Sequence, residues 1–175
     1  MKTKGKISAA LLIIIPALVL LSGCNDKKIS SQMQTAFEKY IGYWNTAQFE
    51  DIAQYVSRDY ELMESPGYEP RQGLDFFRKY IENTRVTYPD FKITVNEVIF
   101  DNERIAYIWT VTGTHLGTGD IPATGRTING KGMSVLHFSE GKVRDEWRSN
   151  NNLQWLVQLG FSINPPAMEN SNQPE

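Results

Sequence analysis

The chain has 175 residues, which suits one domain and is too short for two ordinary ones. Hydrophobic residues make up 41% of it and charged residues 22%, so it is neither disordered nor membrane-embedded throughout. The formal net charge of −2 leaves no basic surplus for binding nucleic acid. One Cys and two His allow no internal disulfide and no Cys-based zinc cluster, and we expect neither a metal site nor a cofactor.

Residues 1–23 have the pattern of a secretory signal peptide. Lys2, Lys4 and Lys6 form a positive start. Residues 7–21 carry no charge, and this run is shorter than the roughly 20 residues that a membrane span needs. The alternative is an uncleaved N-terminal anchor with an unmodified Cys.

Leu21, Ser22, Gly23 and Cys24 resemble the lipobox of bacterial lipoproteins, in which the Cys becomes the new N-terminus and carries lipid. Each buried lipid CH₂ adds about 0.8 kcal/mol, so several acyl chains hold a protein firmly on a bilayer. We therefore expect Cys24 to anchor the protein in a bacterial cell envelope, on the inner or the outer membrane. Residues 24–29 are then a lipidated tether. Loss of residues 1–23 removes three of 18 basic and none of 20 acidic residues, which leaves a net charge of −5.

Helices are predicted in the first half of the mature chain. Apolar residues recur at three- and four-residue spacing from Met33 to Trp44 and predict a helix that Ser30 and Ser31 precede. Further helices are predicted over 49–56 and 72–85. The second of these ends before Pro89, because proline cannot continue a helix.

From residue 91 onward the apolar period changes to two, which predicts strands. The expected strands cover 91–100, 105–115, 127–138 and 143–149, and a last helix over 153–159 is stopped by Gly160. Helices first and antiparallel strands afterwards indicate an α+β fold, with the helices on one face of the sheet. We expect a single domain over 30–164 and a polar, disordered tail over 165–175.

Four segments resemble the SnoaL-like polyketide cyclase (ester cyclase) family of the nuclear-transport-factor-2-like superfamily. They are Tyr88-Pro89-Asp90-Phe91, residues 109–117, residues 121–126, and a C-terminal block that includes Glu146-Trp147 and Gln158-Leu159-Gly160. The resemblance implies a cone-shaped fold, in which a strongly curved antiparallel or mixed sheet wraps around N-terminal helices and leaves a deep apolar pocket. It also implies a small-molecule site. The family's cyclases close a ring in an aromatic polyketide, and an acidic side chain in the pocket moves the proton.

The sequence departs from this family at both proton-handling positions. The family usually carries an Asp four residues after the Trp of the C-terminal block, where this chain has Asn151 after Trp147. An amide cannot exchange a proton at physiological pH. The family also tends to carry a His after an Asp-Tyr-like pair, where this chain has Met63 and Glu64. Both differences argue against the family's own reaction.

The candidate catalytic residues are Asn151, His115, Glu64 and Asp145. Structural roles are the alternatives: His115 bound to a Gly-rich loop over residues 117–126, Glu64 solvated in a loop, and Asn151 capping the last helix. Asp145, Trp147 and Asn151 share strand parity, which would let them line the pocket together. The expected pocket-lining residues are Trp147, Trp109, Tyr107, Trp44, Tyr60 and Met63, although the aromatic ones are also typical core residues.

Three functions remain open. The leading interpretation is an envelope lipoprotein whose pocket binds a small hydrophobic or polycyclic ligand without the family's acid–base cyclisation. The alternative is an enzyme (a cyclase, isomerase or hydrolase) that uses Glu64, His115 or Asp145 in place of the lost Asp. The third is an interaction module that forms a homodimer through the exposed sheet face, for which the apolar residues from Ile105 to Val111 are candidates.

Overall fold

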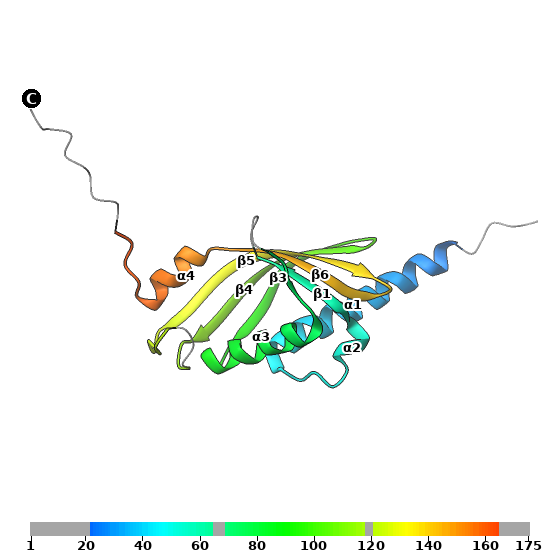
Figure 1. The fold of residues 1–175 in the computed structure, drawn as a ribbon. Helices are drawn as coiled ribbons and strands as arrows, with labels where there is room; N and C mark the ends of the chain where they lie inside the picture. Colours follow the sequence, from blue (N-terminus) through cyan, green and yellow to red (C-terminus); the bar gives the residue numbers. More distant parts are fainter. Residues whose placement is uncertain (1–21, 65–68, 118–120, 165–175) are drawn as a thin grey trace, which may run out of the picture.

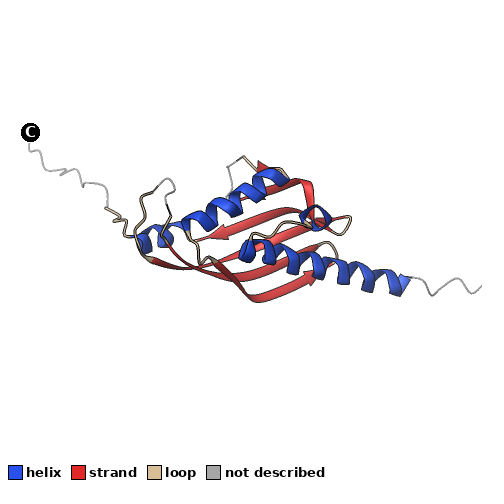
Figure 2. Cartoon of the chain, turned by 90° about the horizontal axis from the view of Figure 1, so that it is seen from below, coloured by secondary structure: helices blue, strands red, loops and turns tan. Residues whose placement is uncertain are grey.

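The computed structural model describes residues 22–64, 69–117 and 121–164. In this part of the chain, helices cover one face of a mixed, curved sheet (Figures 1 and 2). The elements in chain order are α1 (Ser22–Thr46), α2 (Ile52–Tyr55), β1 (Val56–Met63), β2 (Arg71–Gln72), α3 (Leu74–Thr87), β3 (Lys92–Asp101), β4 (Arg104–Thr114), β5 (Thr127–Ser139), β6 (Lys142–Asn150) and α4 (Asn152–Leu159).

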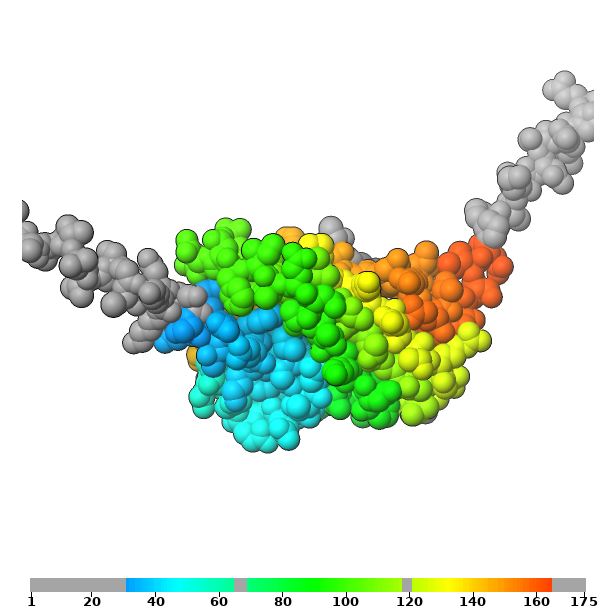
Figure 3. Space-filling model, turned by 180° about the vertical axis from the view of Figure 1, so that it is seen from behind, coloured from blue at the N-terminus to red at the C-terminus, as the bar shows by residue number. Residues whose placement is uncertain are grey.

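The six strands lie in the order β2-β1-β6-β5-β4-β3. β1 and β6 are parallel, with Val56 opposite Val143 and Met63 opposite Trp147. The other neighbouring pairs are antiparallel. The fold is therefore α+β with a mixed sheet, as the sequence predicted. The start of α1 and the whole of α4 lie at opposite ends of the molecule (Figure 1). Seen from behind, the coloured part of α1 (blue) and α4 (orange) lie toward opposite sides (Figure 3).

The N-terminal predictions fall mostly outside the described residues. The predicted signal peptide up to Leu21 and the predicted tail 165–175 lie there. α1 begins at Ser22 and not after Ser30, so the expected tether 24–29 is helical, and its role as a tether stays a prediction. Within the described ranges, no helix is long and apolar enough to span a membrane.

Periodicity predicted α3, α4 and the strands β3 to β6 correctly, but it missed β1. The helix expected over 49–56 is only the short α2, and β1 follows it without a gap. β1 buries Val56, Tyr60 and Leu62. Its pairing register shifts between Val56 and Glu61, so the alternation of apolar and polar residues that marks a strand is broken.

Aromatic side chains fill the space between the helices and the sheet. Tyr40 and Trp44 of α1 meet Phe77 of α3, with ring centroids 5.2 and 5.9 Å apart respectively. All three residues are at most 2% exposed, and burial of one such side chain contributes about 1.5–3 kcal/mol. Asn45 joins α1 to the edge strand β3, because its side chain bonds both the N–H and the C=O of Ile93. These contacts place Trp44 beside the inner face of the sheet.

The turn before β3 is tied to the end of β4. The carboxylate of Asp90 accepts hydrogen bonds from the backbone N–H of Thr114 at 2.6 Å and from its hydroxyl at 2.8 Å. A Cβ on Gly113 would lie 3.1 Å from the Cβ of Tyr88, so the two segments approach closely. Two of the four family-like sequence segments therefore meet in space.

Candidate functional site

A cavity of about 420 Å³ lies between the helices and the inner face of the sheet. This volume falls within the range of small-molecule pockets. Its apolar lining is mainly aromatic and includes Trp44, Tyr80, Tyr88, Phe91, Trp109 and Trp155. The polar lining residues, here called the polar region of the cavity, are Glu64, Thr84, Glu146, Arg148, Asn150 and Asn152.

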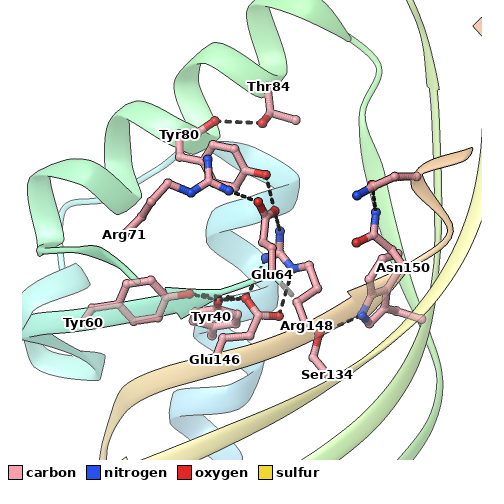
Figure 4. A network of polar contacts seen from close by, with 12 residues as sticks. Tyr40, Tyr60, Glu64, Arg71, Tyr80, Thr84, Ser134, Glu146, Arg148 and Asn150 are labelled. Carbon is pink, nitrogen blue, oxygen red and sulfur yellow. Dashed lines mark hydrogen bonds and ion pairs between the residues drawn. The ribbon is translucent and has the colours of Figure 1, made fainter. Parts of the chain in front are cut away.

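A fully buried carboxylate, that of Glu146, lies at this polar region (Figure 4). It accepts hydrogen bonds from the hydroxyl of Tyr40 at 2.6 Å and from that of Tyr107 at 3.0 Å. Tyr60 donates a longer bond of 3.3 Å. Arg148 binds both carboxylate oxygens through Nε and Nη2, at 3.3 and 2.6 Å. The carboxylate is therefore surrounded by donors, as a buried charge requires.

The charges in this cluster stabilise each other. Burial raises the pKa of Glu146, but the charge and hydrogen bonds of Arg148, together with the hydrogen bonds of Tyr40 and Ser134, lower it, and the pKa lies below its usual value. Burial lowers the pKa of Arg148, and the charge of Glu146 raises it well above its usual value. Burial, followed by the charge of Glu146, raises the pKa of Tyr40, Tyr60 and Tyr107. The three tyrosines stay protonated and act as donors.

Glu64 lies on the cavity wall and not in a solvated loop. It accepts a hydrogen bond of 2.8 Å from the hydroxyl of Tyr80 and forms an ion pair with Arg71. Arg148 approaches it at 3.5 Å. Among the four residues that the sequence suggested for catalysis, Glu64 is the one that lines this cavity.

Asp145 and Trp147 face the other side of the sheet, which corrects the expectation that they line the pocket. Successive side chains of β6 alternate between the faces, and Glu146 and Arg148 take the inner one. Asp145 instead pairs with Nδ1 of His137 at 2.5 Å and with Arg144. Trp147 is 55% exposed on the outer face. The sequence indicated the shared parity of Asp145 and Trp147, but it could not show which face the pocket occupies.

Met63 lies beside Trp147 in the outer groove of the sheet and does not line the cavity. Tyr60 is buried in the hydrogen-bond cluster and is also absent from the cavity wall. Trp44, Tyr107 and Trp109, the other expected lining residues, lie on that wall.

Asn151 and His115 have structural roles in this geometry. Asn151 is exposed, and its side chain caps α4 by accepting a hydrogen bond of 2.9 Å from the backbone N–H of Gln154. His115 is 2% exposed, and its Nδ1 accepts a hydrogen bond of 3.1 Å from the backbone N–H of Thr124. Neither residue lines the cavity, so the structural alternatives describe their positions.

The most important polar residues of the site, Glu146 and Arg148, were missed at the sequence level. Their signal was an opposite-charge pair two residues apart in a predicted strand, and therefore on one face. Tyr80, which donates to Glu64, is not among the residues that the sequence led us to expect in the pocket lining. In the described ranges, no group of three or more His, Cys, Asp or Glu side chains is placed to hold a metal ion.

The fold and the cavity define an α+β domain with an internal small-molecule pocket. Comparison with known proteins identifies its family. The sequence profile described as SnoaL-like polyketide cyclase matches residues 34–159. The chain therefore belongs to the SnoaL-like polyketide cyclase family. No curated protein sequence matches it.

Solved structures share the fold. A proposed polyketide cyclase from Bacillus cereus is 22% identical, with a TM-score of 0.64 over 77% of this chain and 84% of that one. TsrD from Streptomyces laurentii is 20% identical, with a TM-score of 0.65 over 74% and 96%. A SnoaL-like polyketide cyclase from Agrobacterium tumefaciens is 20% identical, with a TM-score of 0.61 over 73% and 98%. At these identities the likeness concerns the fold alone.

Proposed function

We propose that this protein is an envelope lipoprotein whose SnoaL-like domain binds a small hydrophobic or polycyclic ligand, without the family's acid–base cyclisation. The cavity carries the proposal, because its aromatic walls match an apolar ring system and its volume matches a small molecule. The two carboxylates of the cavity lining, those of Glu64 and Glu146, form ion pairs with arginines.

The state of these carboxylates supports binding without cyclisation. Cyclisation in this family needs an acidic side chain that moves a proton, and the position of that acid is Asn151, an amide outside the cavity. Glu146 is ionised and surrounded by hydrogen-bond donors. It is therefore suited to holding Arg148 in place more than to exchanging a proton with a ligand.

Binding can be tested with N-phenyl-1-naphthylamine, an uncharged polycyclic dye whose fluorescence rises in apolar surroundings. We expect a saturable rise with the wild-type protein and a large loss in Val111→Phe, which fills the cavity. Thr112→Phe is the matched control, because Thr112 is an exposed neighbour on the same strand. Absence of saturable binding, or equal binding by both variants, contradicts the proposal.

The alternative function, catalysis by a replacement acid, is favoured by one observation: Glu64 lies in the cavity beside the hydroxyl of Tyr80. If it holds, Glu64→Gln abolishes turnover of a substrate while leaving its binding measurable. The same readouts on Asp145→Asn should show no change, because Asp145 lies on the outer face.

The proposed anchor is a lipid on Cys24. The order of positive start, apolar run and lipobox supports it, and the expected location is a bacterial cell envelope. In a bacterial host fed an alkyne-tagged palmitate, the protein should carry the tag and sediment with membranes. Cys24→Ser should lose the tag. A tag that persists in this variant, or wild-type protein without one, contradicts the anchor.

A further inference from the structure

The helix α4 closes one end of the cavity. The inner face of β6 lines the cavity from Glu146 to Asn150, and the Cα atoms of these two residues lie about 13 Å apart at the usual rise of a strand. Glu146 is fully buried, so it marks the closed end of this path. Beyond Asn150 the chain turns into α4, and three residues of α4 also line the cavity: Asn152, Trp155 and Leu156. The cavity therefore runs along β6 between the Glu146 cluster and α4.

Trp155 is the largest side chain in this end wall, and its ring lies on β5 at a glycine. A Cβ added to Gly130 would lie 3.2 and 3.3 Å from two atoms of the indole and 3.3 Å from a methyl group of Val111. A glycine inside a strand often marks such a close approach of another group. Val111 lines the cavity too. The indole therefore rests on the inner face of β5, beside another residue of the cavity wall.

The ring of Trp155 is held in this place by Tyr88. Its Nε1 donates a hydrogen bond of 2.9 Å to the hydroxyl of Tyr88. The two rings also meet edge-on, with centroids 5.8 Å apart. Tyr88 is itself buried and lines the cavity. The indole is therefore positioned before a ligand arrives, and a ligand can displace it only by breaking these contacts.

The helix that carries Trp155 is tied to the sheet outside the cavity. The side chain of Gln158 accepts a hydrogen bond of 2.6 Å from the backbone N–H of Asn129 and donates one of 3.0 Å to its C=O. Leu159, one turn after Trp155, is buried in the core. These contacts fix α4 on β5, so the end wall is part of the fold and sets a definite length for the cavity.

We infer that Trp155 determines specificity by limiting the length of the ligand, so that the cavity selects compact ring compounds over longer ones of the same chemistry. The inference rests on the proposed function, because it takes the cavity to be the ligand site. It adds the residue that sets the size limit and the direction of that limit, which runs along β6 from Glu146 toward α4.

Two matched uncharged dyes test the limit: N-phenyl-1-naphthylamine, and N-(4-biphenylyl)-1-naphthylamine, which is longer by one phenyl ring in line. The wild-type protein should bind the shorter dye roughly 5- to 150-fold tighter, because overpacking an apolar site costs about 1–3 kcal/mol. The readout is the ratio of the two dissociation constants. A general loss of stability would weaken the binding of both dyes alike and would leave this ratio unchanged.

Three variants assign the limit to one side chain. Trp155→Ala removes the wall and should bring the affinities for the two dyes close to each other or favour the longer one. Trp155→Phe keeps a smaller ring over Gly130 and should give an intermediate ratio, so it serves if Trp155→Ala does not fold. Leu153→Ala is the matched control, because Leu153 is an exposed residue of the same helix that does not line the cavity, and it should keep the wild-type ratio.

The outcomes separate the inference from the proposed function. Wild-type protein that binds the longer dye as tightly as the shorter one overturns the inference and leaves the proposed function intact. The same holds for a wild-type ratio that is retained in Trp155→Ala, or in Trp155→Phe where Trp155→Ala does not fold. Saturable binding of neither dye by the wild type contradicts the proposed function itself, and the inference with it.

Discussion

Glu146 occupies a position that a carboxylate can hold only with charged and hydrogen-bonding partners. Replacing it by Gln keeps the shape but leaves the buried guanidinium of Arg148 with only the more distant carboxylate of Glu64, at 3.5 Å, as its counter-charge. Breaking a buried pair in this way costs about 3–5 kcal/mol. We expect Glu146→Gln to lower the free energy of unfolding in urea by that amount. Glu97→Gln, on an exposed position of β3, should change it by less than about 0.5 kcal/mol. A loss below about 1 kcal/mol for Glu146→Gln would show that the pair is not stabilising.

The same pair predicts how stability depends on pH. The pKa of Glu146 is lower in the folded protein than its usual value, so its contribution is present above the unfolded pKa of about 4.3. It is lost as the pH falls through the lower, folded pKa. The difference in unfolding free energy between wild type and Glu146→Gln should be constant from about pH 7 to 5 and should shrink below about pH 4. A difference that grows on acidification would contradict this sign.

At the scale of elements, α4 depends on its cap. Asn151→Ala removes the acceptor for the N–H of Gln154 and should cost about 1 kcal/mol, measured by urea unfolding. Asn151→Asp should retain the stability, because a carboxylate caps equally well. Gln154→Ala, which keeps the backbone N–H, is the control. A cost in the control equal to that of Asn151→Ala would mean that the cap contributes nothing.

Two glycines give a prediction of opposite sign. A Cβ on Gly132 of β5 would overlap the ring of Trp109 and lie 2.7 Å from the carbonyl oxygen of Ser149. Gly132→Ala should therefore cost about 1–3 kcal/mol. Gly42 lies within α1 with open space around it, so Gly42→Ala should stabilise by about 0.5–1 kcal/mol. Thermal unfolding of each variant checks these predictions. An unchanged or higher unfolding temperature for Gly132→Ala would contradict the packing around Gly132.

The elements also show what sequence can predict. α3 and β4 follow from regular apolar periods, because each buries one regular face. β3, β5 and β6 were predicted although their pairing also shifts, between Val95 and Glu97 and between His137 and Phe138. β1 was missed, because its shift lies within a strand of only eight residues that directly follows a helical turn. At the site, Trp44, Tyr107 and Trp109 could be named as aromatic candidates. Glu146 on the inner face of β6 could not be named as a site residue from the sequence. The residues that stabilise its buried carboxylate, such as Tyr40 and Tyr107, belong to elements far away in the chain.

At the scale of the whole molecule, the outer face of the sheet is partly apolar. The alternating residues that were expected to supply this patch, Ile105, Tyr107, Trp109 and Val111, are instead buried in the core. The register instead aligns one row of apolar residues across five strands: Met63, Trp147, Val135, Ala106 and Ile99.

We propose that a second copy covers this row, because a row crossing the middle of a sheet can face its own copy about a two-fold axis. Sedimentation of the chain lacking residues 1–24 should show a dimer. Trp147→Glu should shift it to monomer, and Val86→Glu, an exposed apolar position on α3, should not. A wild-type monomer would contradict the proposal.

The parallel pairing of β1 with β6 also governs the order in which the molecule can be completed. Val56 lies opposite Val143, 87 residues later in the chain, and Tyr40 and Tyr60 donate to Glu146 of the same last strand. As the polypeptide emerges during synthesis, its first strand can pair early only with the two-residue β2, and its parallel neighbour arrives when nearly the whole domain has been made. Closing so long a loop is entropically costly and typically slow. A chain cut before β6 therefore loses the parallel neighbour of β1 and the ionic centre of the core in a single event.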